Sequence, residues 1–137
     1  MSANLDLVKS VYADWEMGDF SSAGWADPEI ELVVMDGPTP GSSTGLEEMA
    51  TRWGEVLRAY EDFRAIPERF RELDDERVLV FIRNRGRGKA SGLEVADMEP
   101  RSVNLFHIRN GKVIRLVAWW NLEKGLADLG LAREGGS

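Results

Sequence analysis

The sequence predicts an α+β fold in which helices come first along the chain and a curved antiparallel sheet follows. Two observations lead to this class. Apolar residues recur at spacings of three and four in two segments of the first sixty residues, as they do on one face of a helix. After those segments the pattern changes to alternation with period two, which is typical of half-buried strands. The length is that of a single domain, residues 1–137.

The first helix is predicted over residues 4–17, and Gly18 supplies its end. Its apolar face consists of Leu5, Val8, Tyr12 and Trp15. Residues 20–26 (FSSAGWA) allow a short second helix before Asp27-Pro28. Residues 29–35 (EIELVVM) are predicted to form the first strand, which runs into a loop rich in glycine and proline.

A second long helix is predicted over residues 45–60, where residues 44–47 have the spacing of a capping box. Its apolar stripe consists of Leu46, Met49, Trp53, Leu57 and Tyr60. The period-two segments that follow are 63–73, 77–86, 92–99, 101–111 and 112–123. Asn110-Gly111 suits a tight hairpin turn between the last two segments. Residues 123–131 are predicted to form a short terminal helix.

Composition excludes several classes of function. The net charge of −7 argues against binding to nucleic acid or to an anionic membrane. The chain has no cysteine and a single histidine, His107, which excludes thiolate sites and most histidine-based zinc sites. We therefore expect no metal and no other cofactor. Because no signal-peptide pattern and no membrane-spanning run is visible, the expected location is the cytoplasm.

Five short segments follow one another along the chain: VYADWEMGDF, WADPEIEL, STGLEEM, NLFHIRNGKVIRL and EKGLADLGL. Together they resemble the SnoaL-like branch of the nuclear-transport-factor-2-like superfamily, which includes ketosteroid isomerases and polyketide cyclases. The resemblance implies a cone-shaped α+β barrel, in which a strongly bent sheet wraps around long N-terminal helices and encloses an apolar cavity. It also implies a homodimer through the opposite sheet face. The scaffold hosts enzymes and binding modules alike, so it does not determine the function.

Strand alternation sorts the side chains of the sheet by face. The residues predicted to face the cavity are Val80, Ile82, Asn84, Ser102, Asn104, Phe106, Ile108, Ile114, Leu116, Ala118 and Trp120. The opposite face carries Leu105, His107, Val117 and Trp119. That outer set is too apolar for open solvent, so we predict that it forms the homodimer interface. On this basis His107 is interpreted as an interface or surface residue rather than a general base.

Asp36 stands where the first strand meets the Gly/Pro loop, and it has two interpretations. It is either a turn former that binds its own backbone, or an acid held at the edge of the apolar cavity. The resemblance implies that Asp36, nine residues before Gly45, lies where ketosteroid isomerases place their proton-shuttling Asp. It implies that Asn104 lies where they carry a protonated Asp that donates to the developing oxyanion. Asn104 could equally be a satisfied polar residue of the interior.

The resulting functional prediction is a cofactor-free isomerase or cyclase that acts by acid–base chemistry on a compact, mostly apolar carbonyl compound. Asp36 would carry the proton, and Asn104 and Asn84 would polarise the carbonyl. The predicted substrate contacts are Tyr12, Trp15, Trp53, Asn84, Ser102, Phe106, Leu116 and Trp120. The alternatives are a non-catalytic ligand-binding or dimerisation module of the same fold, and an interior simply filled by Trp and Met.

Overall fold

The structure is a computed structural model that describes residues 3–20, 24–36, 40–88 and 101–131. The described residues form three helices and six strands. Their bounds are α1 Ala3–Glu16, β1 Ala26–Val34, β2 Gly41–Thr44, α2 Leu46–Ala59, β3 Tyr60–Glu72, β4 Arg77–Gly88, β5 Arg101–Arg109, β6 Lys112–Trp119 and α3 Leu122–Leu129.

The six strands form one curved sheet in the order β2-β1-β6-β5-β4-β3. The prediction of an antiparallel sheet was wrong in one place, because β1 runs parallel to β6, with Leu32 opposite Leu116. β1 and β6 are far apart in sequence and are joined through α2 and the β3–β5 meander, a connection long enough to bring two strands side by side in the same direction. Among the described residues β2 and β3 are edges, so the sheet is open and not a closed barrel.

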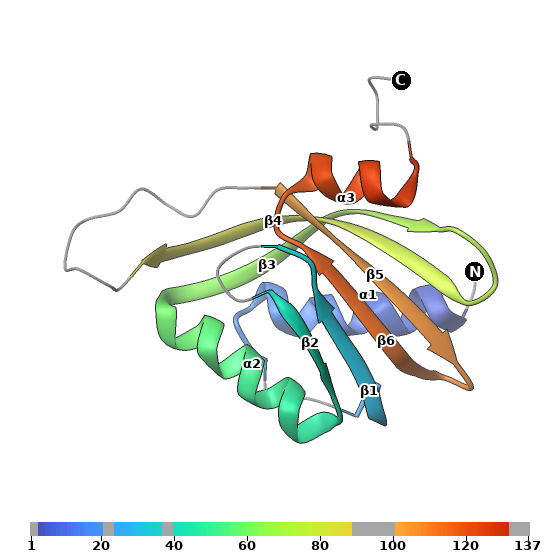
Figure 1. The fold of residues 1–137 in the computed structure, drawn as a ribbon, viewed down its shortest axis with the longest axis horizontal. Helices are drawn as coiled ribbons and strands as arrows, with labels where there is room; N and C mark the ends of the chain where they lie inside the picture. Colours follow the sequence, from blue (N-terminus) through green and yellow to red (C-terminus); the bar gives the residue numbers. More distant parts are fainter. Residues whose placement is uncertain (1–2, 21–23, 37–39, 89–100, 132–137) are drawn as a thin grey trace.

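The two larger helices lie against one face of the sheet and α3 lies against the other (Figure 1). α1 and α2 have 14 residues each, close to the usual 11–12, so the expected long helices are not confirmed. Both helices begin and end within two residues of the predicted bounds. The amphipathic periodicity of the sequence was therefore sufficient to place both helices.

Most strands agree with the prediction, and the differences have local causes. β2 was missed because its sequence, GSST, has no apolar alternation and is largely exposed. Pro67, which interrupts the predicted strand 63–73, lies beside a register shift in the edge strand β3, where a residue without an N–H is tolerated. Asn110 and Gly111 both have positive φ, as the predicted hairpin turn requires. The predicted strand 92–99 lies outside the described residues, as do positions 21–23 of the predicted short helix.

Alternation placed nearly all sheet side chains on the correct face. The inner core includes Val78, Val80, Ile82, Phe106, Ile108, Val113 and Leu116 of the sheet, packed against Val8, Tyr12 and Trp15 of α1. Ile114 was assigned inward, but β6 contains a register shift in which Val113 pairs with Ile108 and Arg115 pairs with His107. The shift leaves Ile114 as an extra, partly buried residue, and Val113 takes its place in the core.

The outer face is apolar because α3 packs on it. Leu126 of α3 joins a cluster made by Leu79, Phe81, Val103, Leu105, Val117 and Trp119. The indole N–H of Trp119 donates to Asp128 of the same helix at 2.9 Å. Leu105, Val117 and Trp119 are thus buried by their own chain, at 9% exposure or less. The homodimer through this face stays a prediction, and the apolar character that motivated it has an intramolecular explanation.

Candidate functional site

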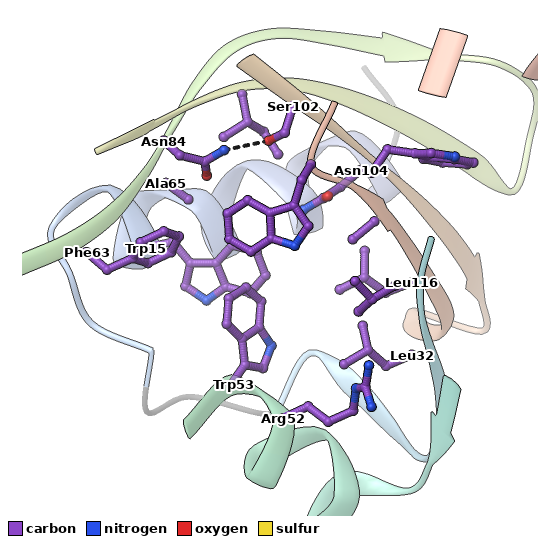
Figure 2. Close-up of a pocket in the computed structure, with 15 residues that line it drawn as sticks. Trp15, Leu32, Arg52, Trp53, Phe63, Ala65, Asn84, Ser102, Asn104 and Leu116 are labelled. Carbon is purple, nitrogen blue, oxygen red and sulfur yellow. Dashed lines mark hydrogen bonds between the residues drawn. The ribbon is translucent and has the colours of Figure 1, made fainter. Parts of the chain in front are cut away.

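A pocket opens between the inner sheet face and the two larger helices (Figure 2). Its volume is about 60 Å³, enough for a few water molecules and below the roughly 300 Å³ of usual ligand sites. The lining residues are Trp15, Leu32, Val34, Arg52, Trp53, Phe63, Ala65, Ile82, Asn84, Ser102, Asn104, Leu116, Ala118, Trp119 and Trp120. A volume this small is close to the alternative in which Trp and other apolar side chains fill most of the interior.

Aromatic side chains from several elements meet at this pocket. Trp15 of α1 lies 5.0 Å from Trp53 of α2 between ring centroids, and 5.7 Å from Phe20 in a stacked arrangement. Phe63 of β3 lies 6.2 Å from Trp120, which follows β6. Trp15 is only 2% exposed, whereas Trp53 and Trp120 are partly exposed. The pocket thus has one fixed aromatic wall and two aromatic side chains that retain access to solvent.

One wall of the pocket is polar and uncharged. Asn84 of β4 and Ser102 and Asn104 of β5 are buried and face inward, as alternation predicted. The Asn84 side-chain amide donates to the Ser102 hydroxyl at 2.8 Å. The Asn104 amide donates to the Tyr12 hydroxyl at 2.9 Å. Burying polar groups costs free energy unless they are hydrogen-bonded, and these pairs meet that requirement.

Tyr12 lies behind the pocket rather than in its lining. Its side chain is fully buried, and burial raises the pKa of the phenol well above its ordinary value, against a smaller lowering by the bond from Asn104. Tyr12 therefore stays neutral and holds the Asn104 amide in place. Phe106 is also fully buried, 5.7 Å from the Tyr12 ring, and belongs to the core beneath the pocket.

Asp36 also lies outside the lining, and its carboxylate binds distant main chain. One oxygen accepts the backbone N–H of Trp120 at 2.6 Å, and the other accepts the N–H of Asn121 at 3.1 Å. The side chain therefore ties the end of β1 to the junction of β6 and α3. This arrangement differs from both sequence interpretations, because the amides are not its own and the carboxylate does not face the cavity. It fixes the backbone of Trp120, whose side chain does line the pocket.

The predicted site residues thus fall into two groups. Those that the structure brings together in the lining are Trp15, Trp53, Asn84, Ser102, Asn104, Leu116 and Trp120. Those placed elsewhere are Asp36, Tyr12 and Phe106. Sequence reasoning missed some of the lining residues. Arg52 is the most notable of these, because no other described residue of the lining is charged. Arg52 stands three residues after the buried Met49, so its side chain could have been predicted to lie on the same face of the helix.

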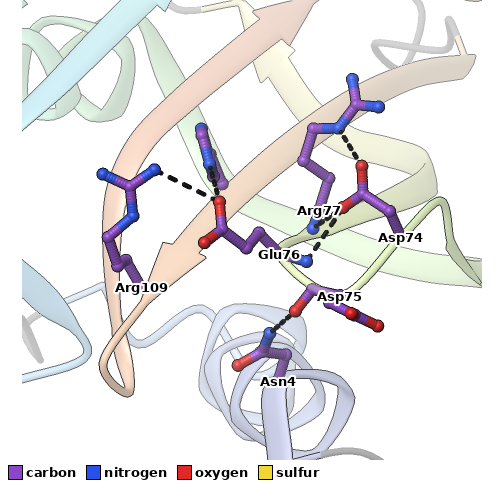
Figure 3. A network of polar contacts seen from close by, with 7 residues as sticks. Asn4, Asp74, Asp75, Glu76, Arg77 and Arg109 are labelled. Carbon is purple, nitrogen blue, oxygen red and sulfur yellow. Dashed lines mark hydrogen bonds and ion pairs between the residues drawn. The ribbon is translucent and has the colours of Figure 1, made fainter.

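A separate polar network lies at the β3–β4 turn, away from the pocket (Figure 3). The Glu76 carboxylate binds His107 Nε2 at 2.8 Å and Arg109 at 3.3 Å. The hydrogen bond from His107, followed by that from Arg109, holds the pKa of Glu76 below its usual range. The pKa of Asp74 is also lowered, first by the backbone N–H of Glu76 and then by Arg77. The network places His107 in a surface ion-pair cluster.

This network predicts a loss of stability in acid. A carboxyl with a lowered folded pKa stabilises the fold above its unfolded pKa, about 4, and the contribution disappears as the pH falls through the folded value. We expect the thermal midpoint to decrease as the pH is lowered from about 5 to about 3. Glu76→Gln should make this decrease smaller. The exposed Glu48→Gln is the matched control. A Glu76→Gln protein with the slope of the parent would contradict this account.

No cluster of three or more His, Cys, Asp or Glu side chains suited to a metal occurs in the part of the chain that the structure describes. None of the described helices combines the length and the apolar character needed to cross a membrane.

Comparison with known proteins identifies the fold. No protein-family model matches the chain, and no curated protein matches it in sequence. Several solved structures do match the chain in fold. An NTF2-like protein of unknown function from Burkholderia pseudomallei matches with a TM-score of 0.76 and 18% identity, over 93% of this chain and 97% of that one. A candidate SnoaL-like polyketide cyclase from a Jannaschia species matches with a TM-score of 0.70 and 14% identity, over 85% and 83%.

A third structure, a protein with a ketosteroid isomerase-like fold from Catenulispora acidiphila in complex with trimethylamine, has a TM-score of 0.70 and 14% identity, over 93% of this chain and 94% of that one. The chain therefore has the α+β fold of the nuclear-transport-factor-2-like and SnoaL-like proteins, as the resemblance implied. At these identities the likeness concerns the fold alone, and the function has to be argued from the site.

Proposed function

We propose that the chain binds a compact, mostly apolar carbonyl compound in the pocket, with the carbonyl oxygen directed at the Asn104 and Asn84 amides. The observation that carries this proposal is the polar wall: buried, uncharged Asn84, Ser102 and Asn104 in a lining that is otherwise largely aromatic and aliphatic. A ligand site of this kind combines apolar walls with a few placed donors. Candidate polyketide cyclases among the similar structures are in keeping with a carbonyl ligand.

Room for such a ligand comes from movement of side chains. The present volume of about 60 Å³ does not hold a substituted benzene ring without adjustment. Trp53 and Trp120 are partly exposed, so they can rotate outward, whereas Trp15 is locked among its neighbours. We expect ligand binding to change the fluorescence of the partly exposed Trp53 and Trp120.

The test compares acetophenone with ethylbenzene, which has a similar shape and no carbonyl. The variant is Asn104→Leu combined with Tyr12→Phe, because removing both members of a buried pair leaves no unpaired polar atom behind. We expect acetophenone to bind the variant about two- to tenfold more weakly and ethylbenzene to bind unchanged. Equal losses for both compounds, or no binding of acetophenone to the parent, would refute the proposal.

A second candidate is the acid–base isomerase or cyclase, in which Asp36 carries the proton. It is favoured by the contact of the Asp36 carboxylate with the backbone N–H of Trp120, a residue of the pocket lining. Catalysis then requires Asp36 to release the two amides that it binds. The readout is exchange of the acetophenone methyl hydrogens for deuterium in heavy water. This alternative expects exchange above buffer and a loss of about 100-fold or more in Asp36→Asn, with binding retained. Binding without enhanced exchange selects the non-catalytic function.

A further inference from the structure

The pocket has a single charged side chain among its described lining residues, and it is a cation. Arg52 comes from the middle of α2 and is partly buried. Figure 2 shows its side chain at the opposite side of the pocket from Asn84 and Ser102, pointing toward Leu32 of β1. The pocket therefore has a neutral amide end and a guanidinium end, with aromatic walls between them.

The guanidinium is held by the strand beside it. Its Nη2 donates to the Gly41 carbonyl of β2 at 3.4 Å, and a Cβ built on Gly41 would lie 3.6 Å from both terminal nitrogens. The guanidinium thus lies close to β2 at a position that carries no side chain. This hydrogen bond to the Gly41 carbonyl helps to position the Arg52 guanidinium beside β2.

The surroundings of Arg52 strengthen its attraction for an anionic ligand inside the pocket, relative to the rest of the protein surface. The chain as a whole carries a charge of −7, which disfavours anions at most of its surface. Inside a largely apolar lining the effective dielectric constant is lower than in water, so a charge there acts more strongly on a ligand. A guanidinium presents paired N–H groups that match the two oxygens of a carboxylate. An arginine that merely covered apolar surface with its stem would give no such preference.

We propose that Arg52 makes the pocket select an aromatic carbonyl compound that bears a carboxylate at the end remote from the carbonyl. The ketone oxygen faces Asn84 and Asn104, the ring lies among the tryptophans, and the carboxylate meets the guanidinium. This inference rests on the proposed function, since it uses the same pocket and the same amide end, and it adds the charge of the ligand.

The experiment compares two probes of nearly equal shape, 4-acetylbenzoate and its neutral amide, 4-acetylbenzamide. Kd is measured for the parent, Arg52→Gln, Arg52→Lys and Arg58→Gln. Arg58 lies on the same helix, is exposed and does not line the pocket, so its variant controls for the loss of one positive charge. Unchanged thermal midpoints verify that the variants are folded.

We expect the parent and Arg58→Gln to bind 4-acetylbenzoate about tenfold more tightly than the amide. Arg52→Gln should lose this preference while binding the amide as before, and Arg52→Lys should keep part of it. The inference alone fails if both probes bind and Arg52→Gln keeps the preference, or if the parent shows none. If neither probe binds the parent, the proposed function and this inference fail together.

Discussion

Replacing Gly125 with alanine should destabilise the protein, although alanine is the better helix former. A Cβ at this position of α3 would lie 2.4 Å from Val103 Cγ1 and 3.1 Å from Cβ and Cγ of Trp119. Val103 and Trp119 are buried in the sheet beneath α3, so neither can move freely. The gain in helix propensity, about 1 kcal/mol, is smaller than the cost of overpacking, about 1–3 kcal/mol or more.

The expected result is a net loss of up to about 2 kcal/mol in the free energy of unfolding, measured by urea denaturation. Gly24→Ala is the matched control, because a Cβ at that exposed position meets no atom within 4 Å. The double variant Gly125→Ala/Val103→Ala removes the atom that would clash, and it should show a smaller loss than the two single variants together. A Gly125→Ala protein more stable than the parent would show that α3 does not pack closely on Val103 and Trp119.

Replacing Trp15 with alanine should have the largest effect of any single change considered. The indole is 2% exposed and touches rings from four elements or loops, including Tyr12 at 4.9 Å and Trp53 at 5.0 Å. Removing a buried Trp side chain costs about 3–5 kcal/mol, through lost burial and the space left behind. The free energy of unfolding of a domain of this kind is about 5–15 kcal/mol, so this substitution removes a large part of the stability.

We expect the thermal midpoint of Trp15→Ala to fall by roughly 10–20 °C. Met17→Ala is the control on the same stretch of chain, because Met17 is 67% exposed and should change stability by less than about 0.5 kcal/mol. Trp15→Phe keeps part of the aromatic contact and should lie between the two. Equal midpoints for Trp15→Ala and Met17→Ala would mean that the aromatic cluster does not stabilise the fold.

Local periodicity was enough to predict the parts of the fold that depend on neighbours in sequence. The spacing of Val8, Tyr12 and Trp15 indicated α1, and the alternation around Asn104 and Leu116 placed these residues on the inner face. These features follow from the geometry of a single helix or strand. The polar wall of the pocket was therefore accessible from the sequence.

Long-range pairing was not accessible in the same way. The parallel pairing of β1 with β6 and the polar strand β2 depend on which segments meet in space. The partners of Asp36 lie 84 and 85 residues further along the chain, so no local pattern could assign the carboxylate to them. Arg52 was overlooked for a related reason. Its position on α2 is close to the apolar stripe, but its role depends on the strand and pocket that it faces.

The central claim is that the buried amides of the inner sheet face form the polar end of a ligand site. The measurement that tests it most directly is a titration of the uniformly ¹⁵N-labelled protein with acetophenone, following the side-chain amide resonances by NMR. We expect saturable shifts of the Asn104 and Asn84 side-chain signals, while the side-chain signals of the partly buried Asn4 and the exposed Asn110, which do not line the pocket, stay unchanged. Saturable binding that moves other resonances and leaves Asn104 and Asn84 unchanged would contradict it.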